Sequence, residues 1–313
     1  MTSLVKQLLR SRESASPVEA LKTYLNSWSA DDERARGVFH PSQISGMFCP
    51  RRWCFSEMEP VENLPLPYNL RLTFDIGHVV HMLLQFYLGD AGYLYGQYVC
   101  RMCGATVVGF KPAEPCPACG AEEPLNLGMN AINSRVWWYK EIDVRNDELL
   151  ITGHSDSILV INNEKYIGEF KSINDRGYSN LIGPLDSHKE QGMLYLWCLD
   201  QDKEGRIFTA NRAFNTFPAF YSAAQERILE VENLPYKGVF VVYFNKNDQK
   251  KLRDFFIPND IKVTQFIDRK RMEILPALKW KRHSGPLPER ICESKADARQ
   301  RKCDYVELCF KKE

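Results

Sequence analysis

The 313-residue sequence has no long apolar segment, no strong net charge and no phosphate-binding loop. No apolar run approaches the roughly 20 residues that a membrane helix requires, so we expect no membrane association. The N-terminal stretch lacks a long apolar core followed by a cleavage site, so we expect no secretion signal and a cytoplasmic protein. A net charge of +1 creates no global field that would attract nucleic acid. No Gly-rich loop ends in Gly-Lys-Ser or Gly-Lys-Thr, which excludes a P-loop nucleotide-driven motor.

Cysteine is abundant, and four of the ten cysteines follow the spacing C-x2-C-x12-C-x2-C. Without a secretion signal, clustered cysteines bind metal more often than they form disulfides. Each C-x2-C turn aims both sulfurs at one ion, and the glycine after each pair permits the tight backbone. The pattern predicts a structural zinc ribbon, closed by four thiolates and therefore not a catalytic centre. Its predicted ligands are Cys100, Cys103, Cys116 and Cys119.

A second set of cysteines, Cys292, Cys303 and Cys309, lies near the C-terminal end. Three thiolates make an incomplete metal site, so Cys49 or Cys54 would have to supply a fourth ligand from the other end of the chain. Unligated thiols and a second zinc site are the alternatives.

Three charged residues lie in the stretch GHSDSILVINNEKYIGEFKS, which has the alternation and the turn of a β-hairpin. With a turn at Asn163-Glu164, Asp156 lies opposite Lys171, and Glu169 shares their face of the hairpin. Two carboxylates suit Mg²⁺ or Mn²⁺, and a neighbouring lysine can position a water or stabilise charge on a phosphate. A salt bridge on a solvent-facing hairpin is the alternative explanation.

Helical patterns flank this hairpin. A helix from about residue 71 to 88 carries His78 and His81, and a helix from about 185 to 199 carries Gln191 and Tyr195 on one face. KGVFVVYF predicts a strand, and we expect a long charged helix from about residue 247 to 280. Its basic run fits either a solvated helix face or a local DNA-binding patch.

Taken in chain order, these residues resemble the RecB-type branch of the PD-(D/E)XK nucleases. The matching motifs are Gly77-His81, Gly153-Asp156, Glu169-Lys171 and Gln191-Tyr195. The resemblance implies that His81, Asp156, Glu169 and the Phe170 carbonyl bind Mg²⁺ or Mn²⁺, with Lys171 as the catalytic lysine. It also implies that Gln191 and Tyr195 position DNA. His154 matches no fixed family position, and we interpret it as a group that supports the metal ligands.

The second cysteine set is similar to that of the AddB-type and CRISPR-associated RecB-like exonucleases. These hold a [4Fe–4S] cluster with one N-terminal and three C-terminal cysteines, the former often followed by Pro-Arg-Arg, as Cys49 is here. The resemblance implies that Cys49, Cys292, Cys303 and Cys309 bind such a cluster, and we interpret Cys54 and Cys198 as core cysteines. The ten residues between Cys292 and Cys303 depart from the short C-x2-C usual in these families.

We therefore expect an α/β protein with a restriction-endonuclease-like core, in which helices flank a central mixed sheet. The expected divisions are an N-terminal helical segment (1–40), a helical part of the nuclease domain (41–97), the zinc ribbon (98–125), the nuclease core (126–284) and an iron–sulfur segment (285–313). The expected activity is metal-dependent exonuclease action on single-stranded DNA ends, in replication, recombination or repair in a bacterial, archaeal or phage-infected cell. The alternatives are a non-catalytic DNA-binding scaffold, or a nuclease subunit that works only beside a helicase, recombinase or CRISPR integrase.

Overall fold

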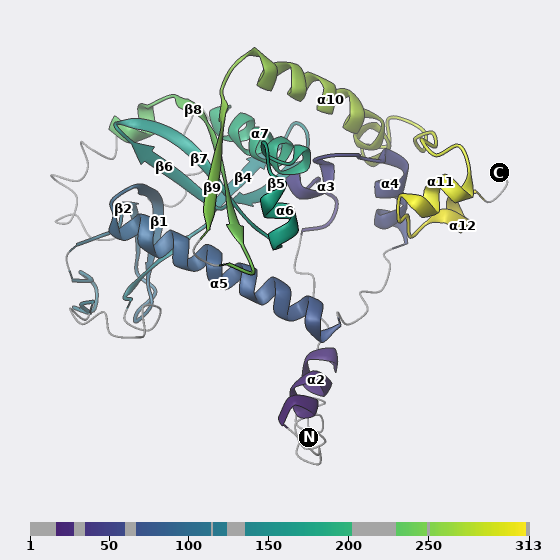
Figure 1. Cartoon of the computed structure of the whole chain (residues 1–313). Coiled ribbons are helices and arrows are strands. Elements are labelled where there is room, and N and C mark those ends of the chain that lie inside the picture. Colours follow the sequence, from purple (N-terminus) through teal and green to yellow (C-terminus); the bar gives the residue numbers. More distant parts are fainter. Residues whose placement is uncertain are drawn as a thin grey trace.

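The computed structural model shows an α/β protein in which helices flank a central mixed sheet (Figure 1). It describes residues 17–27, 35–59, 67–113, 115–123, 135–201, 230–248 and 251–310. The expected N-terminal helical segment is described only as helix α2 and the stretch from residue 35 onward, and the rest of it lies outside the described residues. No helix in these ranges is long and apolar enough to cross a membrane.

The central sheet has the strand order β2-β1-β6-β7-β8-β9, and β3 pairs with β1 outside that path. Among the paired strands of this sheet that the structure describes, β7 and β8 run parallel and the other pairs are antiparallel. A separate two-stranded sheet contains β4 and β5. The strands are β1 (Leu94–Cys100), β2 (Thr106–Phe110), β3 (Trp137–Lys140), β4 (Ile142–Asn146), β5 (Ile151–Ser155), β6 (Ser157–Ile161), β7 (Glu164–Ile173), β8 (Tyr236–Asn245) and β9 (Leu252–Pro258).

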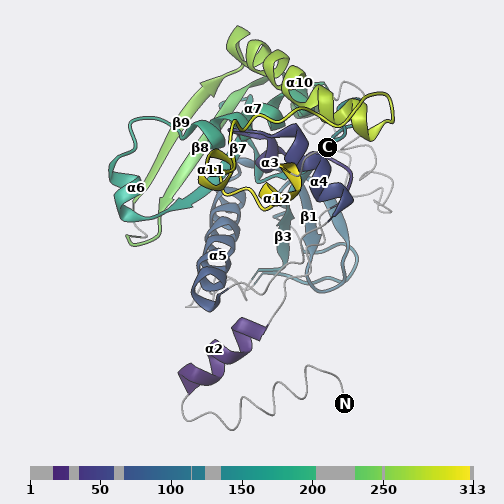
Figure 2. The same ribbon diagram turned by 90° about the vertical axis from the view of Figure 1, so that its right-hand side faces the viewer.

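The described helices lie on both faces and at the ends of this sheet. They are α2 (Pro17–Ser27), α3 (Pro41–Ile44), α4 (Pro50–Met58), α5 (Tyr68–Asp90), α6 (Asp175–Ser179), α7 (Asp186–Asp200), α10 (Ile261–Lys281), α11 (Lys295–Gln300) and α12 (Val306–Cys309). Figures 1 and 2 both show α11 and α12 beside α4, so segments from opposite ends of the chain lie side by side.

Two glycines set the close approach of the flanking helices to the sheet. A Cβ on Gly192 of α7 would lie 2.7 Å from the side chain of Val239 in β8. A Cβ on Gly77 of α5 would lie 3.2 Å from the Ser172 hydroxyl in β7. Because successive residues of a strand point to opposite faces, α7 covers the face that carries Glu169 and Lys171, and α5 packs against the other face.

The β6–β7 hairpin differs from the sequence prediction in its register. The turn residues are Asn162 and Asn163, both with positive φ, and Ile161 pairs with Glu164. A turn in which both central residues have positive φ suits a two-residue hairpin, and asparagine tolerates this conformation. The predicted turn was one residue too late, which shifts the pairing by two positions. Because an even shift preserves the face of each side chain, the predicted grouping of the three charged residues does not depend on the error.

The predicted helix over 247–280 is wrong before residue 261. Residues Leu252–Pro258 form β9, the edge strand that pairs with β8, and α10 begins only at Ile261. The basic run of α10 is not simply a solvated face either, since Lys270 is only 2% exposed. Its ammonium group donates to the Gly46 carbonyl at 2.7 Å and to Glu273 at 2.8 Å.

Candidate active site

Asp156 lies at the point where the chain leaves the small sheet and enters the central one, between β5 and β6. It is 8% exposed. Its Oδ2 atom accepts a hydrogen bond of 2.6 Å from the backbone N–H of Phe170. Its backbone carbonyl accepts another, of 2.9 Å, from Gln85 Nε2 on α5. These two bonds hold the Asp156 carboxylate at the side of β7.

His81 is the histidine of α5 that faces this carboxylate. Its Nδ1 atom lies 3.8 Å from Asp156 Oδ2, and its ring packs edge-on against Phe170. His78, three residues earlier, is exposed. Gln85 follows His81 by one helical turn, so the same face of α5 contacts both the side chain and the backbone of Asp156. The structure therefore brings together His81 and Asp156, two of the predicted ligands.

Glu169 and Lys171 occupy alternate positions of β7, as the sequence predicted. Lys171 Nζ lies 2.5 Å from Glu169 Oε1 in an ion pair. Glu169 is 1% exposed. Within the described part of the chain, neither of its carboxylate oxygens has a partner with hydrogen-bond geometry. Lys171 is thus the one cation beside Glu169 among the described residues, and the carboxylate keeps lone pairs that a further ligand could use.

Glu141, which the sequence prediction omitted, is the third member of the group around Asp156. One ligand atom from each of His81, Glu141 and Asp156 lies within 4.8 Å of the others. Among the described residues Glu169 is not part of that group, and it lies with Lys171 instead. Glu141 sits between β3 and β4. An acidic residue that interrupts the β-rich stretch SRVWWYKEIDV was the available signal.

Burial dominates the electrostatics of these carboxylates. It raises the pKa of Asp156 well above its ordinary value, and the charge of Glu169 raises it further. Burial also raises the pKa of Glu169, against the attraction of Lys171. Burial alone would lower the pKa of Lys171, but the charges of Glu169 and Asp156 together raise it. Crowded, buried carboxylates beside one ammonium group form a site that a cation would stabilise.

Gln191 and Tyr195 lie on α7, which covers the sheet face that carries Glu169 and Lys171. Gln191 Nε2 donates to the Tyr195 hydroxyl at 3.0 Å, and both side chains are buried. Burial raises the pKa of Tyr195, and the charge of Glu169 adds to that effect. A Cβ on Gly153 would lie 3.3 Å from the Tyr195 ring, so the glycine of the second motif makes room for the tyrosine of the fourth.

His154 lies on the exposed face of β5. Its Nε2 atom is 2.9 Å from Asp143 Oδ1. The hydrogen bond that His154 donates to the Asp143 carboxylate raises the pKa of His154. The charge of His154 in turn lowers the pKa of Glu141, against the larger opposing effect of burial. His154 therefore acts on the newly found carboxylate rather than contacting Asp156.

The four cysteines of the first set come together at the end of β1 and the adjoining turns. Cys100 Sγ lies 3.8 Å from Cys119 Sγ, and Cys103 Sγ lies 3.7 Å from Cys116 Sγ. Two matching turns build the group, because the N–H of Gly104 donates to the Cys100 carbonyl and that of Gly120 to the Cys116 carbonyl. Both glycines have positive φ, which glycine adopts without strain. The arrangement is compatible with zinc or with an iron–sulfur site.

The strands that carry this group are continuous with the central sheet. β1 pairs with β2, β3 and β6, so the cysteine-bearing strands join the sheet that holds Glu169 and Lys171. Lys111 and Arg135 also form ion pairs with Asp90, at the end of the helix that carries His81.

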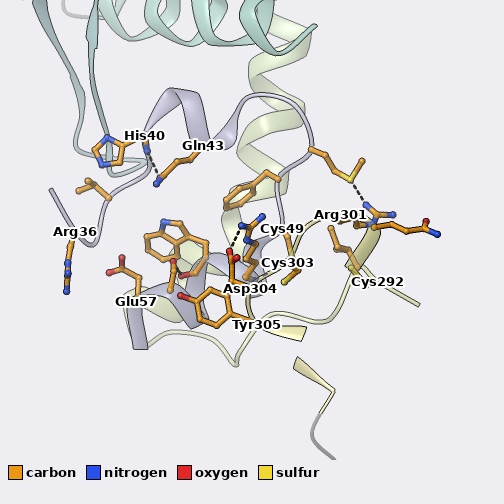
Figure 3. A pocket seen from close by; sticks show the side chains of 18 of the residues that line it. Arg36, His40, Gln43, Cys49, Glu57, Cys292, Arg301, Cys303, Asp304 and Tyr305 are labelled. Carbon is orange, nitrogen blue, oxygen red and sulfur yellow. Dashed lines mark hydrogen bonds and ion pairs between the residues drawn. The ribbon is translucent and has the colours of Figure 1, made fainter. Parts of the chain in front are cut away.

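The second cysteine set lies where α4 meets the C-terminal segment. Cys49, Cys292 and Cys303 line one side of a pocket of about 760 Å³ (Figure 3). Burial raises the pKa of Cys49, Cys292 and Cys309, and the charges of other cysteines in the set raise them further. The pocket thus brings Cys49, Cys292 and Cys303 to one place, and the charge of Cys303 also acts on Cys309. Among the described residues, the sulfurs of this second set are not all within 4.8 Å of one another, unlike those of the first set.

Cys54 differs from Cys49 in its surroundings. It is fully buried, and burial raises its pKa to about 12. Cys49 precedes α4, and its sulfur accepts from the N–H of Arg52. Direct contacts also join the two chain segments here, because Arg52 pairs with Asp304 at 2.7 Å and the Tyr305 hydroxyl donates to the Glu59 carbonyl. Cys198 is buried in the main core.

No protein-family model matches this sequence, and no curated protein matches it. Among solved structures, the chain is similar to the crystal structure of SSO0001, with 13% sequence identity and a TM-score of 0.32. The alignment covers 86% of this chain and 83% of that chain. A TM-score this low carries no argument about fold or function, so the proposals below rest on the residues themselves.

Proposed function

We propose that this protein is a metal-dependent deoxyribonuclease with a RecB-type PD-(D/E)XK active site, acting as an exonuclease on single-stranded DNA ends. The observation that carries the proposal is the position of Asp156. This carboxylate lies beside His81 and is bonded to the backbone of β7 between Glu169 and Lys171. The four motifs that carry the family resemblance thus contribute side chains to one region. The resemblance supplies the choice of DNA as substrate, and the geometry is consistent with it.

The donor set suits a hard divalent cation. Asp156, Glu169 and the Phe170 carbonyl would hold Mg²⁺ or Mn²⁺, with His81 and Glu141 completing the group on the other side of Asp156. The fit rests on the burial of Glu169, whose charge is matched only by Lys171 among the described residues, and on the three ligand atoms gathered within 4.8 Å. When bound, such an ion supplies a Lewis acid for a phosphoryl oxygen.

The other side chains would position the phosphodiester. Lys171 places a positive charge beside the carboxylates, where it would orient the attacking water and stabilise the charge that develops on the phosphate. Gln191 and Tyr195 form a buried hydrogen-bonded pair beside it, which would fix the position of the bound strand. Positioning and charge neutralisation are the main requirements of phosphoryl transfer.

The two cysteine groups would play structural roles. We assign zinc to the first, since the sulfur distances of 3.7 and 3.8 Å are close to the value of about 3.8 Å that tetrahedral geometry gives for Zn–S bonds of roughly 2.3 Å. We assign a [4Fe–4S] cluster to Cys49, Cys292, Cys303 and Cys309. This assignment rests on the family resemblance and on the meeting of Cys49, Cys292 and Cys303 at one pocket, and the cluster would join α4 to the C-terminal segment.

The test is incubation of the purified chain with end-labelled single-stranded and double-stranded DNA in Mg²⁺, Mn²⁺ or EDTA. We expect metal-dependent loss of label from single strands, abolished in EDTA. Lys171→Ala should lower the cleavage rate at least about 100-fold, which is typical for removal of one group that stabilises transition-state charge. Lys262→Ala, an exposed lysine at the start of α10, is the matched control and should cleave at the parent rate.

The outcomes separate the rival functions. Binding of DNA without cleavage in any metal would favour a non-catalytic scaffold. Cleavage that requires an added helicase or integrase would favour a dependent subunit. Cleavage by Lys171→Ala at the parent rate would refute the active-site assignment.

A further inference from the structure

Tyr243 is a buried residue beside the catalytic lysine that none of the four motifs includes. In the parallel pairing of β7 and β8, Lys171 and Tyr243 are register partners, so they lie side by side on the same face of the sheet. Tyr243 is fully buried. The charges of Lys171 and Glu169 both act on its hydroxyl.

The Tyr243 hydroxyl joins β8 to the beginning of α7. It accepts a hydrogen bond of 2.8 Å from the backbone N–H of Leu185, and His188 Nδ1 lies 3.0 Å from it. Because Leu185 already donates to the phenol oxygen, the phenol proton has His188 Nδ1 as its acceptor among the described contacts. We assign the imidazole proton to Nε2 on this basis, since Nδ1 cannot both accept from the phenol and carry a proton. Tyr243 thereby fixes the tautomer and the orientation of the ring.

His188 presents this Nε2–H group on the α7 face that already carries Gln191 and Tyr195. It precedes Gln191 by three residues and Tyr195 by seven, so the three side chains lie along one stripe of the helix. The ring is partly exposed, and Nε2 points away from Tyr243. Within the described chain, Nε2 has no hydrogen-bond partner. Burial lowers the pKa of His188, and the positive charge of Lys171 lowers it further, so the ring is neutral at pH 7.

We propose that His188 is a further substrate-binding residue, whose Nε2–H donates to a non-bridging phosphate oxygen of the bound DNA strand, and that Tyr243 is the positioning residue that aims it. This inference rests on the proposed function and deepens it. A neutral N–H donor beside a lysine suits a phosphate oxygen. Lys171 would balance the negative charge of the strand, and the N–H group of His188 would fix the position of one phosphate oxygen. Hydrogen bonds to charged groups are stronger than those between neutral groups.

The experiment measures binding of a single-stranded oligonucleotide in Ca²⁺, with each phosphate replaced in turn by a neutral methylphosphonate. His188→Ala should weaken binding of the natural strand by about 10-fold, the value of one hydrogen bond to a charged group. The parent should lose affinity at every contacted phosphate. In His188→Ala, methylphosphonate substitution should cease to weaken binding at one phosphate and should still weaken it at the others. A general structural defect would not produce a change at a single phosphate.

Three further variants sharpen the result. His188→Gln keeps a donor at a similar distance from the helix and should restore part of the affinity at that phosphate. Tyr243→Phe keeps the ring and should weaken the same phosphate contact a few-fold. Tyr98→Phe removes another buried hydroxyl, one that donates to the Leu94 carbonyl in the cysteine-bearing region, and should leave the profile unchanged.

The dependence of affinity on salt distinguishes this contact from that of Lys171. A neutral imidazole releases no counterion, so His188→Ala should leave the slope of log affinity against log salt unchanged. Lys171→Ala should reduce that slope by about 0.7. If the parent cleaves DNA but His188→Ala keeps the parent's phosphate profile, the inference is wrong and the proposed function survives. If the parent neither binds nor cleaves DNA, the proposed function and this inference are both wrong.

Discussion

Lys165 provides a quantitative test of the packing, because it is a buried lysine outside the proposed active site. It lies at the beginning of β7 and is 5% exposed. Its ammonium group donates to the Glu232 carbonyl at 2.9 Å and lies 4.2 Å from the centre of the Tyr236 ring. Burial nevertheless lowers its pKa from 10.5 to about 8. Replacement by methionine, which has a similar length and no charge, should stabilise the fold at neutral pH.

The size of the effect follows from the pKa. At about 1.36 kcal/mol per pH unit, the fall from 10.5 to about 8 corresponds to a penalty of about 3 kcal/mol for holding the charged form at pH 7. Methionine also loses the hydrogen bond to Glu232, which costs about 1 kcal/mol. We therefore expect Lys165→Met to raise the free energy of unfolding at pH 7 by about 2 kcal/mol, to order of magnitude.

The sign of the pH dependence is fixed by the direction of the pKa change. Between pH 8 and 10.5, the folded protein binds fewer protons at Lys165 than the unfolded chain does, so the stability of the parent rises with pH in this window. The advantage of Lys165→Met should therefore be full below pH 8, small by pH 10 and reversed above it.

The assay is urea unfolding of parent and variant at several values between pH 7 and pH 10. Lys237→Met, an exposed lysine in the adjacent strand, is the matched control and should change stability by no more than about 0.5 kcal/mol at any pH. Only the difference between parent and variant is informative, because other groups also titrate in this range. A destabilised Lys165→Met protein at pH 7, or a difference independent of pH, would refute the reasoning.

Three other predictions concern the metal groups. Glu141→Gln should raise the Mg²⁺ concentration needed for half-maximal cleavage about 10-fold or more, whereas Glu148→Gln, a change at an exposed residue, should not. If parent and Glu141→Gln need the same Mg²⁺ concentration, Glu141 is not a ligand. Cys116→Ser should abolish zinc in elemental analysis and expose the cysteine-bearing region to protease, yet spare part of the nuclease activity, and a zinc content equal to the parent's would contradict the assignment. Anaerobically purified protein should be brown, and Cys49→Ala should bleach it and destabilise it by roughly several kcal/mol, whereas Cys54→Ala should do neither. The converse result would identify Cys54 as the ligand.

The local features of this protein could be predicted from the sequence because short-range physics determines them. The spacing of the first four cysteines, with a glycine after each pair, is sufficient to build two matching turns around one point. The helix with His81, the helix with Gln191 and Tyr195, and the strand with Glu169 and Lys171 were each visible as a periodic pattern. The α/β class followed from the same patterns, and the mixed sheet flanked by helices confirms it.

Other features depended on which segments pair, and local sequence does not specify that. The stretch INNEK allows a turn at either of two positions, and the pairing of β6 with β7 selects Asn162-Asn163. The segment at Leu252–Pro258 has the charges of a surface helix, but it becomes a strand because the edge of β8 offers it a hydrogen-bonding partner.

The sequence by itself nominated most of the candidate site residues, and the tertiary structure decided which of them meet and which further side chains join them. Glu141 joins His81 and Asp156 only because the chain turns between β3 and β4 beside the end of β5. Tyr243 reaches Lys171 and His188 through a parallel pairing between strands more than 60 residues apart in the sequence. Contacts of this kind leave no periodic signal, since each depends on the position of a whole element rather than on its neighbours in the chain.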